Sequence, residues 1–229
     1  MKIMTFNILH CMDYLTKKID FKKFADEILA NGADIVGLNE VRGKGLLKDY
    51  TAQAKKLGEL TGMEHYFGKA INVMGVAPYG NGLLSKYPIA SAETIKIPDP
   101  AKKTGSEMYE SRAIIKAVID AGRRYTVLVT HMGLNLDERE NAVKTLLSTA
   151  PDEGCIIMGD FNCTPDSKEL KPLFEKYICA DTDTLTFPSD EPRIKIDYIF
   201  VSRDIEIINR GTTTDIVSDH LAQWIEIKE

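Results

Sequence analysis

Apolar residues recur along the chain in short runs, and several runs alternate apolar and polar side chains as strands covered on one face do. About nine strands are predicted on this pattern. The runs at 113–120 and 125–132 flank the sequence DAGR, whose glycine suits a tight turn, so we predict an antiparallel hairpin there. The expected strands span residues 2–9, 34–41, 64–71, 82–90, 113–120, 125–132, 155–161, 195–201 and 221–227.

Four amphipathic helices are predicted where apolar residues recur at helical spacing. In the first helix, Asp20 is placed to cap the N-terminus. In the last helix, Asp166 and Glu169 have the spacing of a capping box, and Pro172 is expected in the first turn. The expected helices span residues 20–32, 48–60, 136–150 and 166–177.

The mixture of strands, hairpins and helices along the chain indicates an α+β arrangement, with sheets packed face to face and helices outside. The 229 residues, 44% of them hydrophobic and 28% charged, are ordinary for a globular chain with a sizeable core. No linker rich in proline, glycine and serine divides the sequence, so we expect a single domain over residues 1–229.

Charge and composition narrow the class of partner. The formal net charge of −5 and the lack of a long basic run disfavour tight binding of nucleic acid, because the overall field repels a polyanion. The N-terminal residues MKIMTFNILH lack the apolar core of a signal peptide, and no stretch of about 20 residues is apolar enough to span a bilayer. We expect a cytoplasmic protein that acts as a monomer. The four cysteines form no C-x-x-C pair and are expected to be small buried side chains.

Polar side chains interrupt or directly follow several of the strand-like runs. Carboxylates and amides at the ends of buried strands are costly unless a cation or hydrogen-bond partner receives them. Their oxygen donors, without thiolates, suit Mg²⁺ or Mn²⁺ rather than zinc. We therefore predict that they converge on one metal site at a shared sheet edge. The residues are Asn7, Asn39, Glu40, His131, Asp160, Asn162, Asp197, Asp219 and His220.

Each of these positions also has an ordinary interpretation. A single Asp or Asn after a strand is more often a turn former than a ligand, and a lone histidine such as His131 is more often a half-buried side chain with its hydrogen bonds made. Arg112 would ordinarily form a surface ion pair, and we interpret His10 and His65 as ordinary side chains. The joint pattern favours a site. Ser218, Asp219 and His220 do not suggest an acyl hydrolase, since no G-x-S-x-G elbow is present.

The ordered motifs TFN, LNEV, ESRA, VTH, GDFN, IDYIF and SDH, between residues 5 and 220, resemble those of the endonuclease/exonuclease/phosphatase superfamily. This superfamily includes DNase I, abasic-site endonucleases, neutral sphingomyelinases and inositol-polyphosphate 5-phosphatases. The resemblance implies a four-layered αββα sandwich of two packed mixed β-sheets with flanking helices. It also implies hydrolysis of a phosphoester that depends on Mg²⁺ or Mn²⁺.

The resemblance further implies a role for each matched position. Glu40 would be the principal metal ligand, with Asn7 and Asp219 completing the surroundings of the ion. One ion is favoured over two. Asp160 would position or deprotonate the attacking water, and Asn162 would hold a phosphate oxygen. His220 would contact the scissile phosphate, and Asp197 would be the carboxylate that orients its ring. His131 would be a second catalytic histidine, and Arg112 a basic residue that faces the phosphate.

The substrate is open at this stage, because subgroups of such a fold differ mainly in their loops. Residues 72–82 and 98–110 are the expected rim loops. Lys102, Lys103 and Tyr109 could touch an anionic substrate, but a solvated loop is the favoured interpretation for the two lysines. The segments GNGLLSKYPIA and THMGLNLDERENAVKTLL look more like small bacterial members and the sphingomyelinase branch than like abasic-site endonucleases. A small or lipid-derived phosphodiester is therefore favoured. The alternatives are a nuclease acting on DNA or RNA, a non-catalytic module that binds phosphorylated ligands, and a scaffold with a structural ion.

Overall fold

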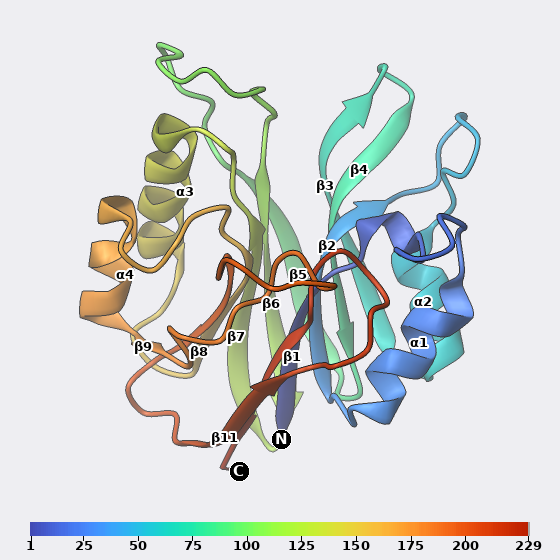
Figure 1. The fold of residues 1–229 in the computed structure, drawn as a ribbon. Coiled ribbons are helices and arrows are strands. Elements are labelled where there is room, and N and C mark those ends of the chain that lie inside the picture. The colour runs from blue at the N-terminus through green and yellow to red at the C-terminus, as the bar shows by residue number, and fades with distance from the viewer. Residues whose placement is uncertain (229) are drawn as a thin grey trace.

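The computed structural model describes residues 1–228, which form two mixed β-sheets packed face to face (Figure 1). The first sheet contains β1 (Lys2–Asn7), β2 (Ile35–Arg42), β3 (Glu64–Val73), β4 (Ala77–Ser85), β11 (Ile207–Thr212) and β12 (Gln223–Ile227). The second contains β5 (Ile89–Lys96), β6 (Ala113–Ala121), β7 (Arg123–His131), β8 (Cys155–Asp160), β9 (Ile178–Cys179) and β10 (Asp197–Val201). The strand orders are β11-β12-β1-β2-β4-β3 and β5-β6-β7-β8-β10-β9.

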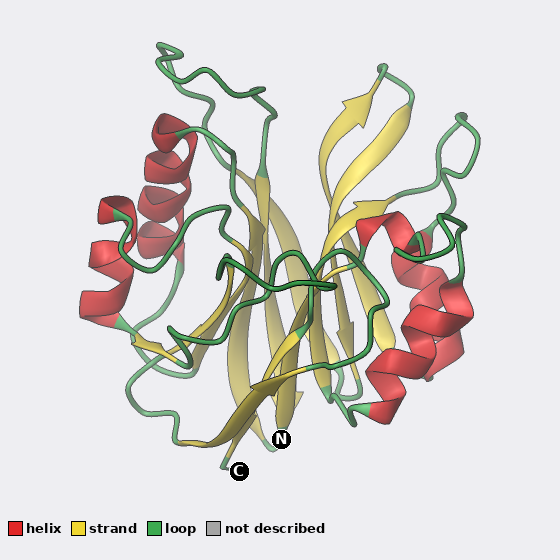
Figure 2. Cartoon of the chain, in the orientation of Figure 1, coloured by secondary structure: helices red, strands yellow, loops and turns green. Residues whose placement is uncertain are grey.

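Helices cover both outer faces of the paired sheets (Figure 2). The first sheet is covered by α1 (Phe21–Ala30) and α2 (Gln53–Thr61), and the second by α3 (Leu136–Thr149) and α4 (Lys171–Lys176). Short 3₁₀ turns, η1 (Leu9–Cys11) and η2 (Lys168–Leu170), complete the helical segments of the described chain. The four-layered αββα sandwich implied by the sequence motifs is confirmed.

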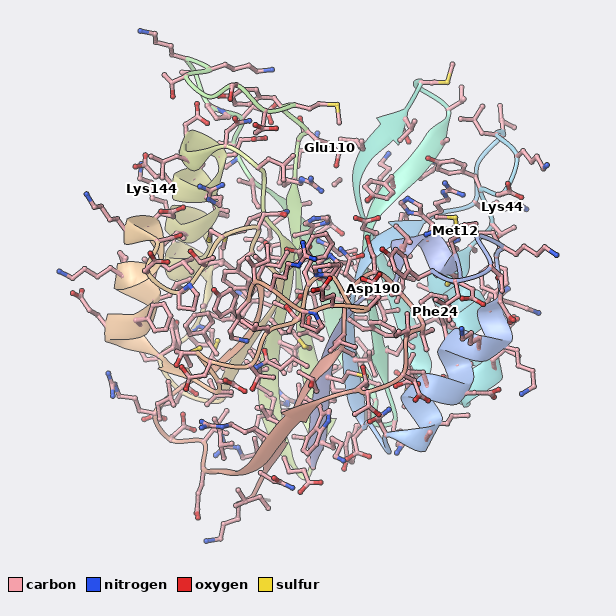
Figure 3. The ribbon with its side chains drawn as sticks, in the orientation of Figure 1. Met12, Phe24, Lys44, Glu110, Lys144 and Asp190 are labelled. Atoms are coloured by element: carbon pink, nitrogen blue, oxygen red, sulfur yellow. The ribbon has the colours of Figure 1, made fainter. Side chains whose placement is uncertain are left out.

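Three apolar layers hold the sandwich together. The layer between the two sheets includes Ile3, Val127 and Met158, all completely buried. A second layer lies under α1 and α2, where Phe24 projects from α1 towards the first sheet (Figure 3). A third lies under α3 and α4 and includes Phe200. Burial of a large apolar side chain contributes about 2 kcal/mol, so these layers supply most of the driving force for folding.

Several local predictions are confirmed. The Asp20 side chain caps α1 by accepting a hydrogen bond from the Lys23 N–H at 3.0 Å. The predicted hairpin exists, since β6 and β7 pair antiparallel around Gly122, whose φ of +79° is easy only for glycine. Pro172 lies in the first turn of α4. All four cysteines are free and three of them are buried. No helix among residues 1–228 has the length and apolar character that crossing a membrane requires.

The prediction of a single strand over 82–90 is wrong, because β4 and β5 belong to different sheets. Residues 86–88 turn the chain from one sheet to the other, and Pro88 has no N–H to give to a ladder. The expected number of strands is also too small, because two edge strands have no recognisable sequence pattern. The missed strands β9 and β11 are edge strands, and most residues of β11 are partly or fully exposed, so no alternation marks them.

Two further expectations fail. The capping box of Asp166 and Glu169 does not form, because Glu169 instead binds the Arg139 guanidinium at 2.6 Å and Asp166 accepts from the Thr164 hydroxyl. The segment 72–82 is not a rim loop. Its residues mostly belong to the β3–β4 hairpin, and only the positions between these strands form the turn. Residues 98–110 form a loop, as expected.

Candidate active site

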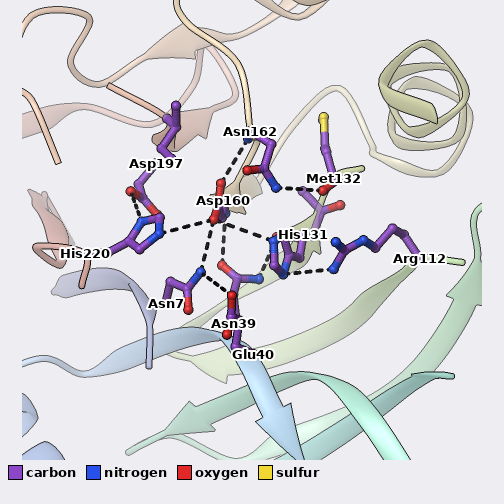
Figure 4. Close-up of polar contacts among 12 residues, drawn as sticks. Asn7, Asn39, Glu40, Arg112, His131, Met132, Asp160, Asn162, Asp197 and His220 are labelled. Atoms are coloured by element: carbon purple, nitrogen blue, oxygen red, sulfur yellow. Dashed lines mark hydrogen bonds and ion pairs between the residues drawn. The ribbon is translucent and has the colours of Figure 1, made fainter. Parts of the chain in front are cut away.

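The polar residues at the strand ends meet because of how the strands pair. β1 and β2 run parallel and place Asn7 beside Asn39, while β7 and β8 run parallel and place His131 beside Asp160. β10 runs antiparallel to β8 and places Asp197 beside Asp160. The carboxyl ends of β1, β2, β7 and β8 and the amino end of β10 therefore meet at one edge of the sandwich (Figure 4).

Two buried asparagines join the sheets at this edge. The Asn39 amide on β2 donates to the Thr130 carbonyl on β7 at 2.7 Å and to Asn81 Oδ1 at 2.9 Å. Its Oδ1 accepts from the backbone N–H of Asp160 at 2.9 Å. Asn81 in turn donates to the Ala113 carbonyl on β6 at 2.8 Å. Because buried amides lose these bonds if they shift, the pair fixes the first sheet against the second.

Asp160 lies at the centre of the cluster, with only 2% of its surface exposed. Its Oδ2 accepts from the Asn7 amide at 3.1 Å and lies 3.6 Å from His131 Nε2 and 3.7 Å from His220 Nε2. Its Oδ1 accepts from the Asn162 N–H at 2.9 Å. Burial raises the pKa of Asp160 to about 7, although the nearby His220 charge opposes the rise. The carboxyl group therefore changes charge near neutral pH.

Glycine before Asp160 allows this placement. Gly159 has a φ of +148°, and a Cβ added there would lie 1.8 Å from the Thr130 carbonyl oxygen. Any other side chain would push β8 away from β7 at the last pair before the site. The sequence Gly-Asp at the end of a buried strand thus has a local steric reason.

His220 and Asp197 form a buried ion pair, with His220 Nδ1 2.8 Å from Asp197 Oδ2. The Phe187 ring lies against the imidazole, with ring centroids 4.8 Å apart. Burial opposes a charged imidazole, but Asp197 and then Asp160 outweigh it and raise the pKa of His220 to about 10. His220 is therefore an imidazolium at neutral pH, with Nδ1 held by Asp197 and Nε2 directed towards Asp160.

His131 has the opposite electrostatic character. Burial, followed by the positive charge of Arg112, lowers the pKa of His131 well below its usual value. Arg112 Nη1 lies 3.2 Å from His131 Nδ1 and 2.9 Å from Glu110 Oε1. Because the guanidinium can only donate, the ring proton of the neutral His131 belongs on Nε2, which faces Asp160. Within residues 1–228, the buried Arg112 Nε has no hydrogen-bond partner.

Glu40 projects from an irregular point in β2. Its φ is +60°, and the pairing of β2 with β4 shifts register between Leu38 and Val41. The carboxylate lies 3.4 Å from the Asn7 amide and 3.5 Å from His10 Nε2. His10 Nδ1 also lies 3.0 Å from the Glu40 carbonyl oxygen. His10 is half-buried and its ring nitrogens have partners, as expected of an ordinary histidine, but both partners belong to Glu40, so the ring adjoins the candidate site.

Asp219 and Asn162 lie at the margin of the cluster. The Asp219 carboxylate accepts from the Ser218 hydroxyl at 3.1 Å, and its charge adds to the rise of the His220 pKa. Burial lowers the pKa of His10, and the charges of Glu40 and Asp219 oppose this fall. The Asn162 amide donates to the Met132 carbonyl at 2.9 Å. Because the buried Ser218 hydroxyl points to Asp219 and not to His220, the chain lacks a serine–histidine pair at this place, as the sequence indicates.

All the predicted site residues except Asp219 are linked by direct contacts, and Asp219 is linked by its charge. The pattern of strand ends leaves out His10 and Asn81. His10 lies on the short turn η1, where positive φ values at Leu9, His10 and Cys11 redirect the chain. Asn81 falls in a segment predicted as loop. The contact of His10 with Glu40 and the contact of Asn81 with Asn39 could have been recognised only with the strand order known.

The donor set suits a divalent cation. Asn7, Glu40 and Asp219 offer carboxylate and amide oxygens, and none of them is a thiol. The Asn7 amide N–H groups face Glu40 and Asp160, and Asn7 Oδ1 accepts from the Leu9 N–H at 3.2 Å. Asp197 Oδ1 is buried and has no hydrogen-bond partner within residues 1–228. A more compact group, Asp160, Asp197 and His220, has ligand atoms within 4.8 Å of one another. In that group His220 Nδ1 is already bonded to Asp197 Oδ2 at 2.8 Å.

Comparison with known proteins agrees with this geometry. The profile of the Endonuclease/Exonuclease/phosphatase family matches residues 4–220. The chain belongs to this family. Members of the Endonuclease/Exonuclease/phosphatase family hydrolyse phosphoesters, so the chain has the fold and the family of a phosphoester hydrolase. No curated protein matches its sequence.

Solved structures of this family share the fold at low sequence identity. A family member from Beutenbergia cavernae superposes with a TM-score of 0.82 at 19% identity, over 99% of this chain and 71% of that one. A mannosyl-6-phosphatase from Bacteroides thetaiotaomicron gives 0.76 at 15% identity over 100% of both chains. The human nocturnin catalytic domain, with bound sulfate, gives 0.72 at 19% identity, over 100% of this chain and 94% of that one.

Proposed function

We propose that the protein is a Mg²⁺- or Mn²⁺-dependent hydrolase of phosphodiester bonds in a small or lipid-derived substrate. The observation that carries the proposal is the contrast around Asp160. A carboxyl group with a pKa of about 7 faces an imidazolium on one side and a neutral imidazole on the other, all three buried. Pairs of titratable groups whose surroundings push their pKa values apart are typical of acid–base catalysis.

Asp160 is suited to orient and deprotonate the attacking water. A general base works best when its pKa lies near the working pH, and burial brings the Asp160 carboxyl close to it. His220 has the complementary role of a positively charged hydrogen-bond donor. Its charged ring donates through Nε2 to a phosphate oxygen, while Asp197 holds Nδ1 and so fixes the direction of the ring.

Three further side chains are placed to receive the negative charge that grows on the phosphoryl oxygens. Arg112 has a buried Nε without a partner, so one donor is free for a phosphate oxygen. His131 presents its Nε2 proton on the same side as His220, and the Asn162 amide has one N–H beyond its bond to Met132. Such donors stabilise the transition state because they are already in place before charge develops.

We assign the cation to Glu40, Asn7 and Asp219, with one ion favoured over two. The cluster of Asp160, Asp197 and His220 is less suited, because metal ligands must be deprotonated and His220 is protonated at neutral pH. When bound, Mg²⁺ or Mn²⁺ polarises a phosphoryl oxygen and lowers the pKa of water. His10 and Asn7 orient the Glu40 carboxylate through the contacts described above.

A small or lipid-derived phosphodiester is favoured over DNA or RNA. The net charge of −5 opposes the approach of a long polyanion, and nucleic-acid enzymes usually present an extended basic surface. Hydrolysis of nucleic acid stays the alternative activity. A binding module that recognises phosphorylated ligands without cleaving them is the non-enzymatic alternative.

The test is a substrate panel with Mg²⁺, Mn²⁺ or a chelator. The panel contains bis-p-nitrophenyl phosphate, a phosphomonoester, sphingomyelin, plasmid DNA and an abasic-site duplex. We expect metal-dependent cleavage of diesters, and loss of cleavage in Glu40→Ala and His220→Ala. The exposed residues Glu59 and His65 provide the matched controls Glu59→Ala and His65→Ala. Activity that survives in either site variant would contradict the assignment, and cleavage of DNA alone would establish the alternative.

A further inference from the structure

A cavity of about 400 Å³ has Arg112 in its wall, whereas Asp160 and His220 do not line it. Its lining residues come from β3 in the first sheet, from the end of β5 and from the connection between β5 and β6, which are elements of the fold in Figure 1. The side chains that line the cavity include Lys69, Asn72, Lys96, Asp99, Ser111 and Arg112.

The lining is basic, in contrast to the acidic chain as a whole. Lys69 within β3 and Lys96 at the end of β5 line one cavity from opposite sheets, together with Arg112. Within residues 1–228, neither lysine has an ion-pair or hydrogen-bond partner, whereas the carboxylate of Asp99 already accepts from the Ser111 hydroxyl at 2.9 Å. Two ammonium groups are thus available to a ligand.

Arg112 is shared by the cavity and the candidate active site. Its guanidinium contacts His131, which lies 3.6 Å from Asp160, and the residue also forms part of the cavity wall. A substrate whose scissile phosphate is held at Asp160 and His220 could therefore extend its remaining part past Arg112 towards this space. The volume is typical of a pocket for a small molecule and is too small for a duplex.

β3 and β5 contact each other beside the cavity, where the Tyr66 hydroxyl on β3 lies 3.1 Å from Thr94 Oγ1 on β5. The pairing of β3 with β4 shifts register between Lys69 and Ile71. The irregular part of β3 therefore coincides with the residues that line the cavity, Lys69 to Asn72.

We propose that this Lys69/Lys96 subsite binds a second anionic group of the substrate. The inference rests on the proposed function and narrows its substrate class to compact phosphoesters that bear a further phosphate or carboxylate beyond the scissile group. Paired ammonium groups and one guanidinium recognise such a group by charge-assisted hydrogen bonds. Lys102 and Lys103, which the sequence suggested for an anionic substrate, are exposed on the loop and do not line the cavity.

The test compares probes that differ only in the second charge. 3-Phosphonopropionate and 5-phosphonovalerate have a phosphonate and a carboxylate, while propylphosphonate and pentylphosphonate of matching chain length lack the carboxylate. Inhibition constants are measured against bis-p-nitrophenyl phosphate, and dissociation constants are measured by calorimetry. We expect the native protein to prefer a carboxylate probe over its partner by about tenfold or more, and Lys69→Gln/Lys96→Gln to lose this preference.

The double variant Lys102→Gln/Lys103→Gln is the control, because it removes the same charge outside the cavity. It should keep the preference. Equal affinity of the native protein for both members of each probe pair would overturn the subsite, as would an undiminished preference in Lys69→Gln/Lys96→Gln. Calorimetry separates the two proposals. Lysine-dependent preference in a protein that cleaves no phosphoester would contradict the proposed function and still support the subsite.

Discussion

Asp197→Asn isolates the buried charge that supports His220. The substitution keeps the size of the side chain and its place at the start of β10, but removes the negative charge 2.8 Å from His220 Nδ1. The imidazole remains buried, with 5% of its side chain exposed. Its positive charge therefore loses the carboxylate that offsets most of the cost of burial. We expect the pKa of His220 to fall and its ring to lose its fixed direction.

The structure sets the size of the effect. The rise of the His220 pKa from 6.5 to about 10 is equivalent to about 5 kcal/mol of preference for the imidazolium, at about 1.4 kcal/mol per pKa unit. Asp197 contributes most among the raising groups, followed by Asp160 and Asp219. Loss of a positioned acid–base group usually costs about 100-fold or more in turnover. We therefore expect a fall of that order in kcat, with a much smaller change in KM.

The assay follows hydrolysis of bis-p-nitrophenyl phosphate from about pH 6 to about pH 11 with saturating metal. In the native protein the imidazolium is lost as pH rises through about 10, so activity should fall there. In Asp197→Asn this limb should move to lower pH. Folding stability measured in chelator gives a second readout. Because the folded pKa lies above the ordinary 6.5, His220 stabilises the native protein fully below 6.5 and progressively less as pH rises to about 10.

Asp204→Asn provides the control, because it makes the same chemical change at a carboxylate outside the site. Asp204 binds Arg123 at 2.8 Å and accepts from the N–H of Gly154, which directly precedes β8. The variant should leave turnover and the basic limb unchanged. Turnover within threefold of the native value in Asp197→Asn, together with an unmoved basic limb, would refute the role given to the pair.

Other expected outcomes test separate parts of the site. Mg²⁺ at about 100 times its Kd should raise the Tm of the native protein by about 5 °C or more, and Glu40→Gln should abolish the rise in calorimetric scans. Asn39→Ala should lower the free energy of unfolding by about 3 kcal/mol in urea, because three buried hydrogen bonds are lost. In chelator, the free energy of unfolding should decrease as the pH rises from about 4 to about 7, because the folded pKa of Asp160 is raised from 3.8 to about 7. Asp160→Asn should lack this decrease.

Much of the site could be predicted from sequence because of one geometric regularity. Glu40, His131 and Asp160 each lie at the carboxyl end of a buried strand, and apolar runs mark such strands clearly. Parallel neighbours bring their carboxyl ends to one edge, so polar residues at these ends meet without further information. The layered fold followed from the same runs and from the ordered motifs.

The rest depends on neighbours that no local pattern reveals. Asn39 and Asn81 join the two sheets, yet each could equally be a turn former until the strand order is known. His10 reaches Glu40 only because η1 adopts positive φ values. Lys69 and Lys96 line one cavity because β3 and β5, edge strands of different sheets, contact each other. Each of these facts is a consequence of tertiary packing.

The division of the site between two sheets has a functional consequence. The residues assigned to the cation lie on β1, on β2 and just before β12, all in the first sheet, whereas Asp160 lies on β8 in the second. The Asn39 amide is bonded to both sheets, so under the proposed assignment it would control the separation of the cation from Asp160. A small displacement of one sheet would leave the ligands of the ion together and yet move Asp160 out of line with them. Asn39→Ala should therefore lower turnover more than it lowers the affinity for Mg²⁺, and equal losses of both would mean that the cation is shared across the sheets.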